Sequence, residues 1–234
     1  MGVKRVKIAH LYPNELNLYG DTGNIICLCY RLKKRGYEPE IESVNIGDRL
    51  NDFDILVIGG GQDREMKLIQ NDLKRKSEML SFSINSGKAV FAVCAGFQLL
   101  GNYYKNKCKD VMILSGVLDF YTEASEQRMI GNIVFETPFG KVAGFENHSG
   151  KTYLSNKLKP LGRVISGCGN NGEDYSEGLL YKNTFATYAH GAVLPKNPAL
   201  ADEIIKRALT VDELPPLDDE LENLCHNQLI HRYS

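Results

Sequence analysis

The sequence predicts an α/β fold, in which a mostly parallel sheet lies between two layers of helices and carries an antiparallel extension. Over the first half of the chain, segments with strand character alternate with helical segments, and this order is typical of a parallel sheet with right-handed crossovers. The strand segment 54–58 is a continuous apolar run, as expected of a strand buried on both faces. Residues 110–190 instead contain short β-like runs separated by Gly, Pro and Asn, which favours antiparallel strands.

The first half of the chain supplies four strands and two helices. Residues 6–11 predict the first strand, and a loop containing Pro and Gly follows it. The next segment places apolar residues at helical spacing until Gly36 ends the helix. Alternation over 40–44 predicts a second strand, 54–58 a third, 64–83 a helix and 88–93 a fourth strand. This order is that of a flavodoxin-like three-layer sandwich.

The second half predicts the extension and the end of the chain. The extension consists of the runs 111–114, 130–135, 141–145, 178–181 and 184–188. Asn197 and Pro198 are a suitable N-cap and first residue for a last helix that runs to Leu209. We therefore expect one domain over residues 1–210 and a helical tail over 211–234, which begins near Pro215 and Pro216.

Composition and charge exclude several classes of protein. The 234 residues are 43% hydrophobic and 24% charged, and the net charge is −1. Without a basic excess, nucleic acid is not expected as a partner. No run of about 18 uncharged apolar residues exists, so we expect no integral membrane protein. The start of the chain lacks a secretion signal and the six cysteines form no C-x-x-C pair or zinc-like cluster, which predicts a cytoplasmic protein without a metal site.

Cys94 is the strongest candidate for chemistry. It follows the fourth strand directly and precedes Ala95 and Gly96, and this pattern predicts a sharp turn that exposes the side chain at the edge of the sheet. A sulfur at a helix N-terminus is expected to favour the thiolate. The backbone N–H of Ala95, together with N–H groups of Gly60 and Gly61 after the neighbouring strand, is expected to hold a developing oxyanion.

A cysteine nucleophile needs a base, which is normally a histidine. His226 and His231 lie in the polar tail, and His10 ends the first strand. The remaining candidates are His148 and His190. His190 follows a late β-like run and precedes a glycine, so the residues alone place it narrowly ahead of His148.

Several separated motifs resemble one enzyme family. Residues 93–101, VCAGFQLLG, resemble the nucleophile motif of class I glutamine amidotransferases, and 144–148, GFENH, with 190–191, HG, resemble the cobyric acid synthase-like branch. Residues 11–24, 59–63 (GGGQD) and 190–198 are similar to GatD-type subunits of lipid II isoglutaminyl synthase. The resemblance covers roughly residues 5–210 and implies that Cys94 is the nucleophile and His190 the catalytic base. It also implies that Arg128 and Gln98 bind glutamine, and a guanidinium suits the α-carboxylate of that substrate.

The sequence departs from the family pattern at two positions. Ala92 stands where the nucleophile motif usually has Gly, which is a small change. Ala192 stands where many class I enzymes have an acidic residue two positions after the histidine. The group that orients His190 must then come from a partner or from elsewhere in the chain, or be missing; Glu146 and Asp174 are candidates within the extension.

The resemblance implies a subunit that hydrolyses glutamine and supplies ammonia to a Mur ligase-like, MurT-type partner, which amidates the stem-peptide glutamate of lipid II. Residues 144–152 almost match a phosphate-binding loop, but the first spacing is one residue too long and no helix is predicted after it. We therefore expect no cofactor on this chain, with ATP and Mg on the partner. The alternatives are an amidotransferase of corrinoid synthesis, which usually carries a fused synthetase domain, and a non-catalytic binding protein of the same fold.

Overall fold

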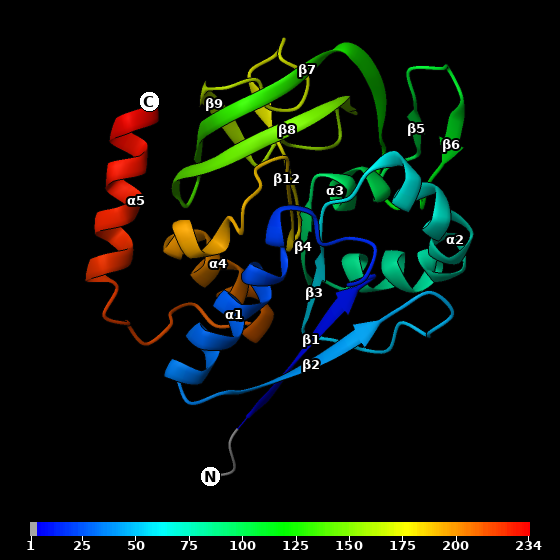
Figure 1. Ribbon diagram of the computed structural model, residues 1–234. Helices are drawn as coiled ribbons and strands as arrows, with labels where there is room; N and C mark the ends of the chain where they lie inside the picture. Colours follow the sequence, from blue (N-terminus) through cyan, green and yellow to red (C-terminus); the bar gives the residue numbers. More distant parts are fainter. Residues whose placement is uncertain (1–3) are drawn as a thin grey trace.

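A computed structural model describes residues 4–234 and confirms the predicted three-layer α/β sandwich (Figure 1). The central sheet has the strand order β11-β12-β4-β3-β1-β2. Its five parallel strands are β1 (Arg5–Leu11), β2 (Glu38–Val44), β3 (Ile55–Ile58), β4 (Ala89–Val93) and β12 (Thr184–Thr187), and β11 (Leu179–Tyr181) is an antiparallel edge. The predicted absence of a secretion signal rests in part on residues 1–3, which lie outside the described residues.

Helices cover both faces of this sheet. Helices α1 (Thr22–Lys34) and α4 (Pro198–Leu209) lie on one face, and α2 (Asp63–Asn85) and α3 (Ala95–Leu99) lie on the other (Figure 1). Short 3₁₀ turns η1 (Leu18–Gly20) and η2 (Leu194–Lys196) precede α1 and α4. Strands β3 and β4 are buried along their whole length, which explains why their sequences are continuous apolar runs.

The predicted bounds of α4 are confirmed, with Asn197 at the N-cap, Pro198 as the first residue and Leu209 as the last. Asn197 precedes the helix, but its side chain makes no capping bond. Instead, its amide exchanges two hydrogen bonds of 2.9 Å with the backbone of Ala143 and donates to Val193 O at 2.6 Å. Asn197 is buried, and satisfying the backbone of the neighbouring β-strand takes precedence over capping because that backbone has no access to water.

The antiparallel extension is a second sheet with the order β10-β9-β7-β5-β6, in which β8 pairs with β7. Its strands are β5 (Tyr103–Lys105), β6 (Val111–Ile113), β7 (Phe120–Thr137), β8 (Gly140–Leu154), β9 (Gly162–Ser166) and β10 (Ser176–Glu177). The long β7–β8 hairpin lies above the carboxyl ends of the parallel strands (Figure 1). In this position the hairpin forms one wall of any site at that edge of the central sheet.

Two runs assigned to the extension belong to the central sheet. Residues 179–181 and 184–187 form β11 and β12, and β12 pairs in parallel with β4. All four residues of β12 are buried, and so short a buried run carries no periodicity that distinguishes the two sheets. The consequence for function is that the segment after β12, which contains His190, leaves the central sheet at the same edge as Cys94.

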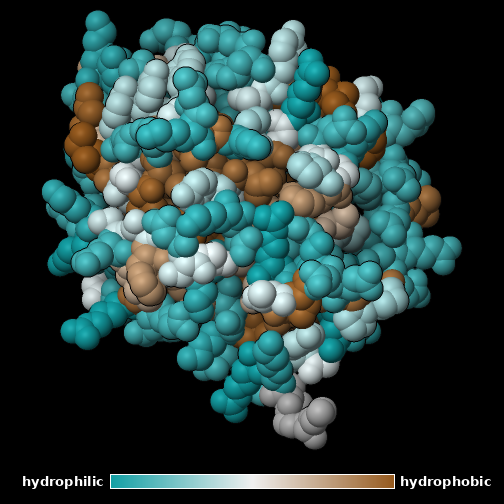
Figure 2. Space-filling view, turned by 180° about the vertical axis from the view of Figure 1, so that it is seen from behind, coloured by the Kyte–Doolittle hydropathy of each residue, from teal (hydrophilic) through white to brown (hydrophobic). Residues whose placement is uncertain are grey.

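The C-terminal segment contains the helix α5 (Glu220–Tyr233), which packs beside β7, β8 and η2. Arg31 of α1 and Arg35, the C-cap residue of that helix, both bind Asp202 of α4, and Arg31 also binds Asp219 in the segment that leads to α5. On the face opposite to that of Figure 1, apolar side chains gather in a band across the molecule (Figure 2). Within residues 4–234, no helix combines the length and the apolar character needed to cross a membrane.

Candidate active site

Cys94 stands at a strained turn between β4 and α3. Its backbone has φ 50° and ψ −105°, a conformation that is costly for a residue with a side chain and that clusters at functional sites. The turn is held because Cys94 N–H donates to Thr187 O at 2.8 Å and Gly96 N–H donates to Gly59 O at 3.1 Å. A β-carbon on Gly96 would lie 2.5 Å from Ile58 O, so only glycine permits α3 to start this close to β3. The strand-turn-helix geometry agrees with the sequence prediction, whereas the side chain of Cys94, which was expected to be exposed, is buried.

Burial disfavours the thiolate form of Cys94. Burial raises its pKa to about 12, the charge of Asp21 acts in the same direction, and the Ala95 N–H and Arg128 oppose them. The sequence-based expectation of a thiolate is therefore wrong for this state. The physical reason is that α3 has only five residues and Cys94 is buried, so desolvation outweighs the helix terminus. The sulfur needs a base to remove its proton.

Four of the predicted site residues line one pocket. Cys94, Gln98, Gly61 and Arg128 surround a cavity of about 460 Å³ at the carboxyl edge of the central sheet. A volume of this size suits a small polar molecule. The pocket therefore joins residues from the β4–α3 turn, from the loop after β3 and from strand β7.

A buried chain of hydroxyl groups fixes Gln98 on the pocket wall. Gln98 Nε2 donates to Tyr188 Oη at 3.0 Å, and Tyr188 Oη lies 2.6 Å from Thr152 Oγ1. Thr152 Oγ1 in turn lies 2.7 Å from Thr122 Oγ1. These hydrogen bonds connect α3 to strands β7 and β8, so the extension holds one end of the pocket in place.

Arg128 reaches the pocket because β7 is irregular at that point. The register between β7 and β8 shifts between Ala124 and Met129, and such a bulge redirects side chains. Arg128 Nε donates to Asn147 Oδ1 at 2.5 Å, and Asn147 Nδ2 donates to the hydroxyl of Tyr19. The Tyr19 ring meets the His190 ring edge-on, with centroids 5.1 Å apart. One contact chain therefore runs from the arginine to the histidine.

In the loop after β3, one of the three expected oxyanion donors is already bound to another residue. Gly60 N–H donates to Asp21 Oδ2 at 2.6 Å, so it is not free to bind an oxyanion in this structure. Gly61 lines the pocket, and the N–H of Ala95 is directed at Cys94. Of the three donors expected from the sequence, Gly61 and Ala95 thus remain suitable.

The two candidate histidines have different surroundings. His190 is completely buried, its backbone N–H donates to Phe145 O at 2.7 Å, and burial together with the charge of His148 lowers its pKa to about 4. His148 lines the pocket, stacks on the ring of Tyr188 with centroids 3.7 Å apart, and binds Gly150 O through Nδ1 at 2.8 Å. Both ring nitrogens of His190 lack a hydrogen-bond partner within residues 4–234, so the unprotonated ring nitrogen is available to accept a proton.

The carboxylate beside His190 is Asp21, which the sequence analysis did not single out. Neither expected candidate is there: Glu146 accepts from Cys168 N and Gly169 N at 2.7 and 2.9 Å, and Asp174 accepts from Ser176 N at 2.8 Å. Asp21 Oδ2 lies 4.0 Å from His190 Nδ1. The only sequence signal was the polar motif Asp21-x-Gly23-Asn24, which precedes an apolar helix and resembles an ordinary helix start.

Comparison with known proteins agrees with this geometry. Residues 7–198 match the CobB/CobQ-like glutamine amidotransferase domain. The GatD subunit of the glutamine-hydrolysing lipid II isoglutaminyl synthase of Staphylococcus aureus is 40% identical over 232 residues, which cover 96% of this chain and 95% of that protein. The corresponding subunit of Streptococcus pneumoniae is 42% identical over 210 residues, covering 88% of this chain and 81% of that protein.

Among solved structures, a glutamine amidotransferase superposes with a TM-score of 0.60 at 18% identity, covering 86% of this chain and 98% of that one. At this identity the likeness shows the fold alone, and it agrees with the sandwich described above. The two subunits, by contrast, combine 40% and 42% identity with coverage of most of the chain, and the domain match spans residues 7–198. The chain belongs to the CobB/CobQ-like glutamine amidotransferases and, within them, to the family of the GatD subunits.

Proposed function

We propose that this chain is the glutaminase subunit of a lipid II isoglutaminyl synthase, which takes ammonia from glutamine for the amidation of the stem-peptide glutamate. The observation that carries the proposal is the pocket in which Cys94 stands on a strained turn beside Gln98 and Arg128. The family to which the chain belongs gives that pocket its substrate. The contacts below give each residue a role.

The reaction begins with a neutral thiol. As the sulfur of Cys94 attacks the side-chain amide carbon of glutamine, His190 takes the thiol proton, and the oxygen of the tetrahedral intermediate is held by the N–H groups of Ala95 and Gly61. His190 then gives the proton to the amide nitrogen, the C–N bond breaks, and ammonia leaves. Water attacks the resulting thioester through the same base, which releases glutamate and restores the thiol.

Substrate recognition rests on Arg128. Its Nε is already bound to Asn147, which leaves the two terminal nitrogens free to bind the α-carboxylate of glutamine through parallel hydrogen bonds. Gln98 lines the same pocket with its amide orientation fixed by Tyr188. This arrangement supports selection of an α-amino acid by its carboxylate and its amide at the two ends of the pocket.

A synthetase partner follows from the chemistry of ammonia. At neutral pH most free ammonia is protonated and is not nucleophilic, so direct transfer to an activated acceptor is favoured. Residues 144–152, the near match to a phosphate-binding loop, lie within the extended strand β8 and lack the loop and helix that cradle phosphate. We therefore place ATP and Mg on a Mur ligase-like, MurT-type partner in the cytoplasm.

The test uses the purified chain, alone and with that partner. Glutamine labelled with ¹⁵N in its side-chain amide should give labelled ammonia with the chain alone and labelled isoglutamine in lipid II with the complex and ATP. A Cys94→Ala variant is the matched control, since it keeps the fold and removes the sulfur. No glutamate release from either preparation would refute the proposed function, and glutamate release without labelled lipid II would refute the proposed acceptor.

A further inference from the structure

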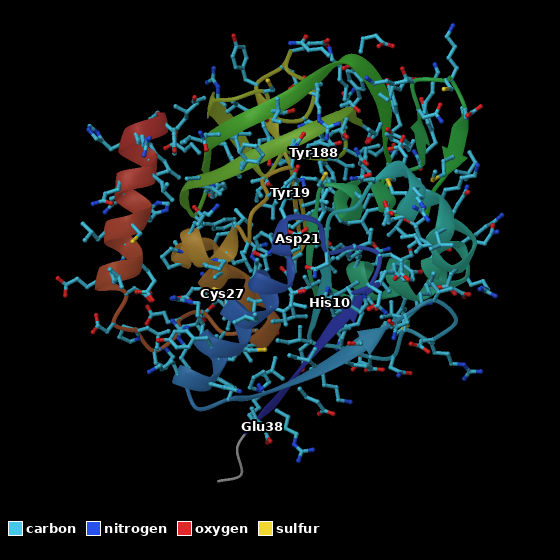
Figure 3. All side chains as sticks on the ribbon, viewed as in Figure 1. His10, Tyr19, Asp21, Cys27, Glu38 and Tyr188 are labelled. Atoms are coloured by element: carbon cyan, nitrogen blue, oxygen red, sulfur yellow. The ribbon has the colours of Figure 1, made fainter. Side chains whose placement is uncertain are left out.

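Asp21, Gly60 and His190 are packed in direct contact behind the pocket. Asp21 and His190 are both completely buried, and Asp21 Oδ2 lies 4.0 Å from His190 Nδ1. A β-carbon on Gly60 would stand 2.7 Å from His190 Cε1 and 3.1 Å from Asp21 Oδ2, so nothing larger than glycine fits beside the pair. Figure 3 shows Asp21 at the start of α1, close to Tyr19 and below the extension.

Capping of helix α1 does not explain the Asp21 carboxylate. Asp21 occupies the N-cap position of α1, but its side chain makes no capping bond. Asn17 does this work instead: its Oδ1 accepts from Thr22 N at 2.9 Å and from Thr22 Oγ1 at 2.8 Å. The aspartate is therefore turned away from its own helix and toward Gly60 and His190.

The carboxylate is also incompletely satisfied. Its Oδ2 accepts one hydrogen bond, from Gly60 N at 2.6 Å, and its Oδ1 has no hydrogen-bond partner within residues 4–234. Burying a charged oxygen without a partner is costly, and an apolar residue would fill the same space at lower cost. Both nitrogens of the neighbouring His190 ring are unpartnered as well. Asp21 Oδ2 thus faces an unpartnered ring nitrogen of His190 while it holds only Gly60 N–H, which is the arrangement expected of a pair used during the reaction.

The chain after His190 shows why the carboxylate comes from α1. Gly191 and Ala192 both have positive φ, 79° and 47°, so the backbone turns sharply after the histidine. Ala192 then packs on Gly23, where a β-carbon would come within 2.6 Å of Ala192 Cβ. Position 192, which carries an acidic residue in many class I enzymes, therefore holds a small residue that packs against α1. Asp21 lies two residues before Gly23, at the start of the same helix.

We propose that Asp21 is the positioning carboxylate of His190, delivered by the start of α1 in place of the acidic residue that is absent at position 192. This inference rests on the function proposed above. Asp21 acts through His190 and does not touch the substrate: it holds the Nδ1–H tautomer, which leaves Nε2 free to take the Cys94 proton, and it stabilises the imidazolium that forms. Through Gly60 it also holds the loop that presents Gly61.

The separation of 4.0 Å fits a ligand-free state. Catalytic hydrogen bonds are often long before substrate binds and shorten in the complex. Burial raises the pKa of Asp21 to about 6, which leaves the carboxyl mostly ionised at neutral pH and able to accept from the histidine. In this role Asp21 accepts from Nδ1–H, and the proton taken from Cys94 passes through Nε2 of His190 to the leaving ammonia.

The kinetic test is Asp21→Asn, which retains an oxygen for Gly60 N–H but removes the charge. We expect kcat for glutamine hydrolysis to fall at least about tenfold, with KM changed by less than about twofold, in the chain alone and in its complex. Asp72→Asn is the matched control. It removes another buried carboxylate, one bound by Tyr12 Oη at 2.8 Å, and should lower stability while leaving kcat unchanged.

A second readout is independent of glutamine hydrolysis. ¹⁵N spectra of the imidazole side chains at pH 7, with His190 assigned by comparison with His190→Gln, report which ring nitrogen carries the proton. We expect Nδ1–H in the wild type and a larger share of Nε2–H in Asp21→Asn, because the oxygen that binds Gly60 N–H also faces Nδ1, and an uncharged amide oxygen is a weaker acceptor for Nδ1–H than a carboxylate. If Asp21→Asn does not fold, the wild-type spectrum alone decides, since an Nε2–H tautomer there would overturn the inference.

The two proposals fail separately. A wild-type chain that never releases glutamate, alone or in complex, refutes the glutaminase assignment, while the tautomer spectra still test the Asp21–His190 pair. A wild type that is active, with an Asp21→Asn variant of unchanged kcat, overturns the role of Asp21 and leaves the glutaminase assignment intact. The same holds if a loss in kcat is matched by Asp72→Asn.

Discussion

A part-buried cluster of charges links the C-terminal segment to α1 and α4. Asp202 accepts four hydrogen bonds, two from Arg31 at 2.6 and 2.7 Å and two from Arg35 at 3.0 and 2.7 Å. The arginine side chains are only 3% and 1% exposed. Arg31 also binds Asp219, and Arg35 donates to Pro215 O at 2.7 Å. Replacing Asp202 by Ala should therefore leave the buried guanidinium of Arg35 without a counter-ion.

The expected loss of stability follows from what each arginine retains. Arg31 keeps Asp219 as a counter-ion, whereas Arg35 keeps only carbonyl oxygens. Breaking a buried ion pair by removing one partner costs about 3–5 kcal/mol, and the partial compensation at Arg31 favours the lower end, about 3 kcal/mol. For a domain of this size each kcal/mol lowers Tm by roughly 2–4 °C, so Asp202→Ala should lower Tm by about 6–12 °C.

The neighbouring residue of the same helix offers a matched control. Glu203 pairs with Lys206 and Arg207, whose side chains are 35% and 25% exposed and can turn to water once the carboxylate is removed, so Glu203→Ala should cost no more than about 1 kcal/mol. Alanine suits a helix interior at both positions, so helix propensity does not explain a difference. Thermal and urea unfolding of the two variants measures it, and limited proteolysis reports release of residues 211–234. Equal Tm values for the two variants would show that the charge cluster does not hold the segment.

The remaining predictions concern the pocket. Cys94→Ser should abolish glutamine hydrolysis, and a glutamine-like electrophile should label Cys94 alone; labelling of any other cysteine in a peptide map contradicts the assignment. Because burial raises the pKa of Cys94 to about 12, its alkylation by a small neutral reagent should quicken about tenfold per pH unit from pH 7 to 9, and a plateau below pH 8 would show a lower pKa. His190→Ala should lower kcat at least about 100-fold in steady-state assays, whereas His148→Ala should act mainly on stability, and the reverse ranking would make His148 the base. Arg128→Lys keeps the charge but loses the planar fork, so KM for glutamine should rise at least about tenfold; an unchanged KM would place Arg128 outside the substrate site.

Local patterns in the chain predicted the features that depend on neighbours in sequence. The apolar runs before Gly59 and Cys94 predict two buried parallel strands, because a strand covered on both faces needs no polar residues. The small residues after Cys94 predict the strained turn, since Gly96 is required by the close approach to Ile58 O. These features need no knowledge of distant segments.

Tertiary structure decided whatever depends on residues far apart in the chain. Asp21 and His190 are separated by 169 positions, and they meet only because α1 packs against the turn at Ala192. The sequence could suggest that an acidic residue was missing from position 192, but it offered Glu146 and Asp174, which bind backbone groups elsewhere.

The protonation state of Cys94 was decided in the same way. A helix N-terminus in the sequence favours a thiolate, but the pKa depends on how completely the surrounding layers exclude water. Only the folded chain, with the extension above the sheet and Asp21 nearby, shows that desolvation outweighs the helix terminus. A sequence determines which groups are available for chemistry, whereas distance and burial, which set their charge and their partners, arise only when the layers pack together.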